Sequence, residues 1–416
     1  MTKKIVCTIL TLAIILSLTA CGKQVEKPAA ADPAESTTAA GETPSPIAPL
    51  PEEEKTVITL ATAYMDGPLY TMIHSFNAQS PDCRVETRVY EFGSWDKLRV
   101  EIMAGQGPDM IDTVSLALGG EQSLYLEDLM PFLERDPELS ADDFIPAVLE
   151  AMQEDGKLYT LTPSFTISAV VDYDGATRTG LSFADYEKAL GPAPDVDDIF
   201  PVPAALENFR DAFSVIENDV VIGNDVDTEL LRGWLQFCKD APGLSVRHEQ
   251  VSSCGRLPAI RTYISPNAEF VGWPAQRSNG FYVMQGGGFL NIGILADSMH
   301  KEEAWRFMRY AAFFAYYDDM FGRDAPNGFD DFPVLKDRFE AHLQKGLEDQ
   351  DYPITEQDAQ RLREIVYGID VPTFRHEGLR TVLLPLAEAY FSGRSGLDET
   401  VTQMASKIRL YVAEHD

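Results

Sequence analysis

The chain alternates strand and helix patterns between residues 57 and 114, and this alternation limits its possible folds more than any other sequence feature. An apolar run at 57–63 has the length of a buried strand, and Pro68 opens a segment with helical apolar spacing. A strand pattern follows at 84–92, a helix pattern begins at Trp95, and an apolar run lies at 110–114. This order requires parallel strands joined by right-handed crossovers. We therefore predict an open α/β sheet.

Ligands on such a sheet bind beyond the carboxyl ends of the strands, where loops and helix N-termini converge. Phe92 and Trp95 lie beyond the second of these strands, for example. A carbohydrate site needs aromatic rings for the apolar sugar faces, and carboxylates or hydroxyls for the sugar hydroxyls. With aromatic residues from later in the chain, the candidate ligand-binding residues are Tyr64, Asp66, Trp95, Asp112, Ser115, Phe165, Trp273 and Tyr282.

Several of these candidates also have a structural interpretation. Asp66 precedes Pro68 and suits a helix N-cap. Trp95 would pack its helix onto the sheet, an interpretation that we slightly prefer, and Asp112 could bond a loop amide instead of a ligand. Trp305, which lies in an amphipathic pattern, is predicted to be a core residue.

The N-terminus has the order of charged, apolar and small residues that marks an export signal. Two lysines precede an apolar run, Ile5–Leu18, which is too short to span a bilayer comfortably. The run ends in Leu18–Gly22 (LTACG), which resembles the lipobox of bacterial lipoproteins. The resemblance implies that Cys21 receives a diacylglycerol and becomes the first residue after cleavage. We expect a signal peptide at 1–20 and a disordered tether at 21–55, rich in Pro, Ala, Thr, Ser and Glu.

Charge excludes nucleic acid as a partner. The formal net charge is −32, and removal of the signal peptide, which carries two lysines and no acidic residue, makes it −34. No basic surface could neutralise phosphates against this background. Three cysteines remain after Cys7 and Cys21 are set aside, an odd number that cannot form a full disulfide framework. A Cys238–Cys254 bond stays open at this point.

Motifs of the common enzyme classes are absent. The six histidines form no close pair, and the sequence has no zinc-protease, CxxC, nucleophile-elbow or phosphate-loop motif. We predict no catalytic residue, no metal site and no cofactor. Paired carboxylates could serve a glycosidase, and a chain with 66 acidic residues does not exclude one.

About 360 residues follow the tether, more than one hydrophobic core usually serves. Several of their motifs resemble the family 1 extracellular solute-binding proteins of ABC importers, over about residues 56–170 and 265–416. The matching segments are Ala63–Asp66 (AYMD), Phe76–Asp82 (FNAQSPD), Ala104–Asp112 (AGQGPDMID), Tyr125–Leu129 (YLEDL), Asp155–Phe165 (DGKLYTLTPSF) and Phe270–Pro274 (FVGWP).

The resemblance implies a periplasmic-binding-protein-like α/β fold with two discontinuous lobes, a hinge and a ligand cleft between them. Lobe 1 would comprise 56–165 plus about 268–318, and lobe 2 about 166–267 plus 319–416. The implied function is capture of a small solute, with an oligosaccharide favoured, and delivery to the transmembrane subunits of an ABC permease. The protein would be a monomer on the extracytoplasmic face of the cell membrane, anchored through Cys21.

Other functions remain open at this point. A receptor for a peptide, polyamine or chelated metal would have a charged cleft rather than an aromatic one. A glycan-acting surface lipoprotein enzyme would need two carboxylates facing each other across the cleft. A divergent receptor could serve as a sensor or structural partner, because the segment between Val171 and Asn267 is short for the family.

Overall fold

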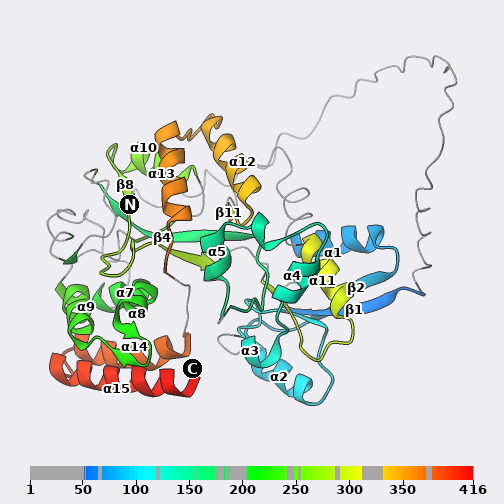
Figure 1. Cartoon of the computed structure of the whole chain (residues 1–416), viewed down its shortest axis with the longest axis horizontal. Coiled ribbons are helices and arrows are strands. Elements are labelled where there is room, and N and C mark those ends of the chain that lie inside the picture. Colours follow the sequence, from blue (N-terminus) through cyan, green and yellow to red (C-terminus); the bar gives the residue numbers. More distant parts are fainter. Residues whose placement is uncertain are drawn as a thin grey trace, which may run out of the picture. The chain divides into compact units, whose positions relative to one another are not determined.

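The structure is a computed structural model, and its described residues belong to one compact unit, Ala48–Asp416 (Figure 1). It describes residues 51, 53–63, 68–118, 122–154, 156–173, 175, 182, 183, 186, 204–240, 248–251, 254–285, 291–311, 331–371 and 377–415.

The first sheet contains the strand and helix alternation that the sequence predicts. Its strand order is β10-β3-β1-β2, with β1 parallel to both β2 and β3, and β10 antiparallel to β3. The elements are β1 Thr56–Thr62, α1 Pro68–Gln79, β2 Cys83–Val89, α2 Trp95–Met103, β3 Met110–Asp112, β10 Ile292–Ile294 and α11 Lys301–Arg309. The parallel strands place the carboxyl ends of β1, β2 and β3 at one edge, which confirms the predicted open α/β sheet.

The second sheet is built on one long strand, β4 Ser164–Asp172. It pairs antiparallel with β7 His248–Val251, β8 Glu269–Val271, β9 Tyr282–Gln285 and β11 Phe332–Pro333. All nine residues of β4 are buried. Because successive side chains of a strand point to opposite faces, a strand buried along its whole length needs a covering layer on each face.

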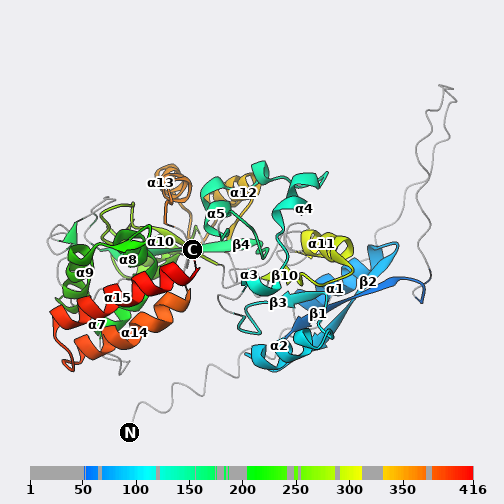
Figure 2. The same cartoon turned by 60° about the horizontal axis from the view of Figure 1, so that its bottom comes forward.

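Helices cover both faces of this second sheet (Figures 1 and 2). Phe165 and Ile167 of β4 belong to one core cluster, whereas Val170 belongs to another. Around the first core lie α5 Pro146–Ala151, α10 Arg256–Tyr263, α12 Lys336–Leu347 and α13 Glu356–Tyr367. Around the second lie α7 Ala204–Asp211, α8 Phe213–Val220, α9 Thr228–Asp240, α14 Glu377–Phe391 and α15 Leu397–His415.

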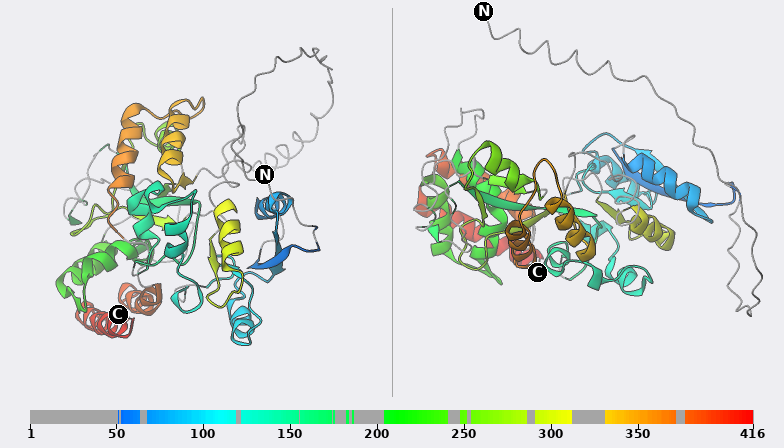
Figure 3. Two further views of the ribbon diagram at one scale, coloured as in Figure 1. Left: turned by 45° about the vertical axis from the view of Figure 1, so that its right-hand side comes forward. Right: turned by 90° about the horizontal axis from the view of Figure 1, so that it is seen from above.

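The remaining described elements are short. They are α3 Gln122–Tyr125, α4 Met130–Arg135, the 3-10 helix η2 Ala141–Asp143 and the hairpin strands β5 Val221–Ile222 and β6 Asp225–Val226. The β5–β6 hairpin connects α8 to α9. The view from above shows the helices of the second core, drawn in green and red, next to one another (Figure 3).

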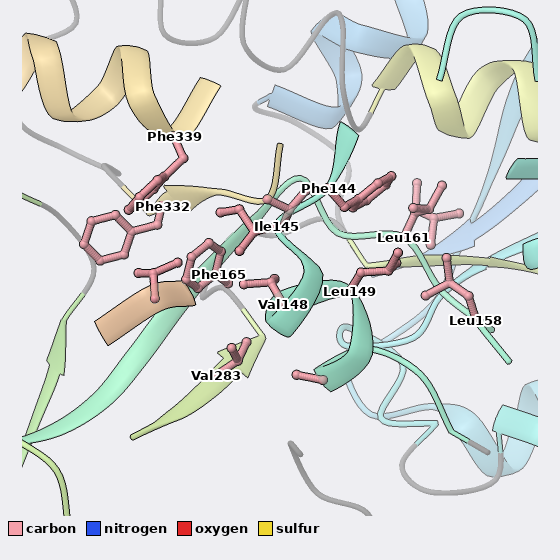
Figure 4. Packing of buried hydrophobic residues seen from close by; sticks show 14 of the residues in the cluster. Phe144, Ile145, Val148, Leu149, Leu158, Leu161, Phe165, Val283, Phe332 and Phe339 are labelled. Carbon is pink, nitrogen blue, oxygen red and sulfur yellow. The ribbon is translucent and has the colours of Figure 1, made fainter. Parts of the chain in front are cut away.

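The chain passes from the first sheet to the second immediately before β4. Leu161 still forms an antiparallel bridge to Ile292 of β10, and β4 begins at Ser164. Close to this passage, α5 and the residues before it pack against the second sheet: the Ile145 N–H donates to the Val334 carbonyl over 2.9 Å. Figure 4 shows Ile145 and its neighbours Phe144, Val148 and Leu149 in one apolar cluster with Phe165, Phe332 and Phe339.

Strand pairing divides the range 268–318, which the sequence analysis assigned to a single lobe. The strands β8 and β9 pair with β4 in the second sheet, whereas β10 pairs with β3 in the first. The reason is that strands of three or four residues carry no local signal for their partner, which long-range register decides.

A buried carboxylate ties α11 to the loop after α4. Asp136 Oδ1 and Oδ2 lie 2.6 and 2.7 Å from Arg309 Nη1, and the Trp305 indole N–H donates to Oδ2 over 2.7 Å. Burial by itself would raise the pKa of this carboxyl, but hydrogen bonds from the Glu138 N–H, the Trp305 indole and the Arg309 guanidinium outweigh it and lower the pKa. The predicted core residue Trp305 is indeed buried.

We expect Asp136→Asn to lower the free energy of unfolding by about 3 kcal/mol at pH 7, because the largely buried Arg309 guanidinium loses its buried carboxylate partner. A lowered folded-state pKa means that the stabilisation is present above the unfolded-state pKa of about 3.9 and is lost as pH falls through the folded-state value. Urea unfolding should therefore show a smaller difference in free energy of unfolding between wild type and Asp136→Asn at pH 3 than at pH 7. The control Glu138→Gln removes an exposed partner of Arg309 and should cost less than about 1 kcal/mol.

Candidate ligand-binding site

Backbone and side-chain hydrogen bonds join the loops at the carboxyl ends of β1, β2 and β3. The Gly93 N–H, after β2, donates to the Ser115 carbonyl, after β3, over 2.9 Å. The Ala63 N–H, after β1, donates to Ser115 Oγ over 3.0 Å. The Thr113 N–H also donates to the Asn291 carbonyl at the start of β10, over 2.9 Å. The loops that parallel strands bring to one edge are therefore fixed to one another.

Asp112, the last residue of β3, lies at the centre of these contacts and is only 1% exposed. Its Oδ2 accepts a hydrogen bond from Thr62 Oγ1 over 3.1 Å, and its Oδ1 accepts one from the Ser115 N–H over 3.4 Å. Burial raises the pKa of the Asp112 carboxyl, although these hydrogen bonds act in the opposite direction. Asp112 and Ser115 thus lie together at the predicted edge, and each bonds neighbouring loops. Their contact with a ligand stays a prediction.

Two large apolar side chains face solvent at this edge, beside the exposed Glu91. Phe92, in the loop after β2, is 70% exposed, and Val114, after β3, is 44% exposed. The candidate Trp95 is only 8% exposed and makes an edge-to-face contact with Tyr125 at a centroid distance of 5.0 Å. Trp95 therefore packs α2 onto the sheet, the structural alternative that the sequence analysis slightly preferred. The sequence analysis placed Phe92 at this edge but did not select it as a ligand-binding residue, because local spacing does not show whether a side chain is exposed.

The aromatic candidates of the second sheet lie in its cores. The Trp273 indole N–H donates to Ser168 Oγ over 3.0 Å, and the Tyr282 hydroxyl donates to the Asp211 carbonyl. Burial raises the pKa of the Tyr282 hydroxyl. Phe165 lies on the opposite face of β4, where its ring contacts Phe332 at 5.7 Å. Ligand contact by these three side chains stays a prediction, and each is fully or almost fully buried.

Ser168, His248 and Asp211 stand in the order hydroxyl, imidazole, carboxylate. Ser168 Oγ lies 3.0 Å from His248 Nε2, and His248 Nδ1 lies 3.3 Å from Asp211 Oδ2. Serine hydrolases use these groups in this order. However, Ser168 is 0% exposed in the interior of β4, and its oxygen already accepts the Trp273 indole N–H. A substrate cannot reach this hydroxyl, so the arrangement ties α7 and β7 to β4.

Several predictions concern residues outside the described part of the chain, namely Cys21, Tyr64 and Asp66. Cys83, Cys238 and Cys254, which lie within the described part, form no disulfide, and Cys238 and Cys254 belong to different core clusters. The described residues contain no group of three or more metal-ligating side chains that could hold an ion. None of the described helices has the length and apolar character needed to cross a membrane.

No family model matches the chain, and no curated protein does either. Solved structures match with a probability of 1.00. An ABC substrate-binding protein from Listeria monocytogenes in complex with cycloalternan has a TM-score of 0.56 at 15% identity, covering 86% of this chain and 99% of that chain. The sugar-binding protein MalE from Xanthomonas citri has a TM-score of 0.59 at 16% identity, covering 86% and 98%.

The chain has the fold of the ABC solute-binding proteins. An ABC transporter solute-binding protein from Agrobacterium vitis S4 with bound D-mannitol matches similarly, with a TM-score of 0.53, 14% identity and coverage of 86% and 99%. Because each match includes nearly all of the solved protein, the likeness concerns the whole fold rather than one shared sheet. This confirms the predicted periplasmic-binding-protein-like fold. At these identities the solute that each relative binds remains a property of that relative.

Substitution of Asp112 tests its structural role. Asp112→Ala should lower the free energy of unfolding by about 2 kcal/mol, because it leaves the Thr62 hydroxyl and the Ser115 N–H without their acceptor. Asp112→Asn keeps an acceptor and should cost less. The raised pKa means that the folded state favours the neutral Asp112 carboxyl. The contribution of this carboxyl to the free energy of unfolding is therefore present below about pH 3.9 and is lost as pH rises through the folded-state pKa. In urea unfolding, the difference in free energy of unfolding between wild type and Asp112→Asn should become smaller as pH rises. A difference that grows with pH would contradict this role.

Proposed function

We propose that the chain is an extracytoplasmic receptor that captures a carbohydrate and delivers it to an ABC import permease. The observation that carries the proposal is the solute-binding-protein fold together with a fixed set of loops at the carboxyl ends of its parallel strands. Ligands on open α/β sheets bind at this edge. The large apolar side chains exposed there suit the flat faces of sugars.

Capture would use two lobes, one built on each sheet. We assign β8 and β9 to the lobe of the second sheet, because they pair with β4, and keep β10 and α11 with the first. A ligand that contacts both lobes only when they are closed shifts the population towards the closed state. The permease would recognise the closed state, which is the ligand-bound form of the receptor. A monomer is sufficient for this role.

We propose a binding role without catalysis. The arrangement that most resembles an enzyme among the described residues is Ser168, His248 and Asp211, and burial of the Ser168 hydroxyl argues against turnover there. A glycosidase would instead need two carboxyl groups roughly 5–10 Å apart on either side of the bound sugar. At the edge of the first sheet, the Asp112 carboxylate is buried and already accepts hydrogen bonds, so it does not suit that role.

Thermal melting against a solute panel tests the receptor function. The full chain, purified in detergent, would be melted with D-glucose, D-mannitol, maltotriose, maltohexaose, xylotriose, a tripeptide, spermidine and zinc. A ligand present at 100 times its Kd stabilises the folded state by about 2.7 kcal/mol, or roughly 5 °C. We expect at least one saccharide to raise the melting temperature by this amount. A shift with spermidine or the tripeptide alone would overturn the carbohydrate assignment and keep the receptor.

We further propose that the receptor is anchored through a lipid on Cys21. This proposal rests on the export-signal order and the lipobox-like segment Leu18–Gly22. Cys21→Ser should move the protein from the membrane fraction to the soluble extracytoplasmic fraction, measured by fractionation and immunoblotting. The control Cys83→Ser changes a thiol of the folded unit and should stay with the membrane. If Cys21→Ser also remained in the membrane fraction after a carbonate wash, the anchor would lie elsewhere.

A further inference from the structure

We propose that Phe92 and Val114 form an apolar wall on which a saccharide ring lies, and that Asp112 and Ser115 position this wall without touching the sugar. The inference rests on the proposed carbohydrate receptor and deepens it. It assigns ligand contact to residues that the sequence analysis did not select, and it gives a positioning role to two residues that the sequence analysis took as ligand contacts.

Exposure distinguishes the two pairs of residues. Phe92 and Val114 are 70% and 44% exposed, whereas Asp112 and Ser115 are almost fully buried. Leaving a large apolar side chain in water forgoes about 1.5–3 kcal/mol that burial would supply. Two such side chains on adjoining loops, at the edge where ligands of this fold class bind, offer that free energy to a ligand.

The wall is held in a fixed geometry. The hydrogen bond from the Gly93 N–H to the Ser115 carbonyl joins the loops at the residue that follows each wall residue. Gly93 has a φ of +76°, a left-handed conformation that a residue with a Cβ rarely adopts. The Ser115 hydroxyl, through the Ala63 N–H, ties the same loop to the end of β1. A surface already in its binding geometry loses little entropy when a ligand binds.

The hydrogen-bonding groups beneath the wall already bond other parts of the chain. Asp112 accepts from the Thr62 hydroxyl and the Ser115 N–H, and Ser115 Oγ accepts from the Ala63 N–H. The exposed Glu91, adjacent to Phe92, is instead a carboxylate available to accept hydrogen bonds from sugar hydroxyls. An aromatic face beside an acceptor suits a pyranose ring, whose apolar face and hydroxyl rim require both.

The test compares single variants of the full chain in detergent. The probe is the saccharide of the panel that shifts the wild-type melting temperature most, and its Kd is measured by isothermal titration calorimetry. Phe92→Ala should weaken binding about tenfold or more, because it removes the ring area that the bound sugar would cover. Phe92→Trp should keep the affinity within a few fold. Tyr70→Ala is the matched control, since Tyr70 is an exposed aromatic on α1 that is 63% exposed.

A Phe92→Ala variant that unfolds like the wild type without sugar, yet binds it at least tenfold more weakly, supports the wall. The loss of an exposed side chain should leave unfolding nearly unchanged. Equal affinity of Phe92→Ala and wild type would overturn the wall while the receptor function stands. If no saccharide shifts the wild type, both proposals fail. If spermidine binds and Phe92→Ala weakens it, the saccharide assignment of the wall is wrong.

Discussion

The burial of β4 on both faces is the constraint on which the rest of the structure depends. Its side chains alternate between two hydrophobic cores, and a nine-residue strand without an exposed face is stable only if helices cover each side. Each layer takes its helices from separate parts of the chain: α5, α10 and α13 pack on one face, and α9 and α15 on the other. The discontinuous organisation of the protein follows from this requirement, since each layer is assembled from segments that are far apart in the sequence.

Three buried polar groups have the same function in different parts of the described chain. Asp112 joins the loops at the carboxyl edge of the first sheet, Asp136 joins α11 to the loop after α4, and Ser168 links Trp273 to His248 across the second sheet. Each replaces hydrogen bonds to water with bonds to specific partners, which fixes one arrangement of the surrounding elements. A binding protein benefits from such anchoring, because the surface it presents to a ligand is then already in place.

Position on the sheet and exposure together narrow the choice of candidate ligand contacts, and in this protein they favour different residues than chemistry alone does. Carboxylates and tryptophans are the side chains that most often suggest a sugar site. Yet Asp112 and Trp273 are buried and hydrogen-bonded within the chain, and Trp95 is buried against Tyr125. The large apolar side chains exposed at the edge, Phe92 and Val114, carry no hydrogen-bonding group. A site inferred from residue type therefore needs the accessible surface before it can be assigned.

The sequence by itself determined the local elements and the fold class. Periodicity predicted β1, α1, β2, α2 and β3 within a few residues, and the core position of Trp305 followed from its amphipathic pattern. Only the tertiary structure decided that β8 and β9 pair with β4, that Phe92 faces solvent while Trp95 does not, and that Ser168 meets His248 and Asp211. The physical reason is that periodicity depends on neighbours along the chain, whereas pairing and exposure depend on partners that can lie about 180 residues away, such as Ile292 opposite Asp112.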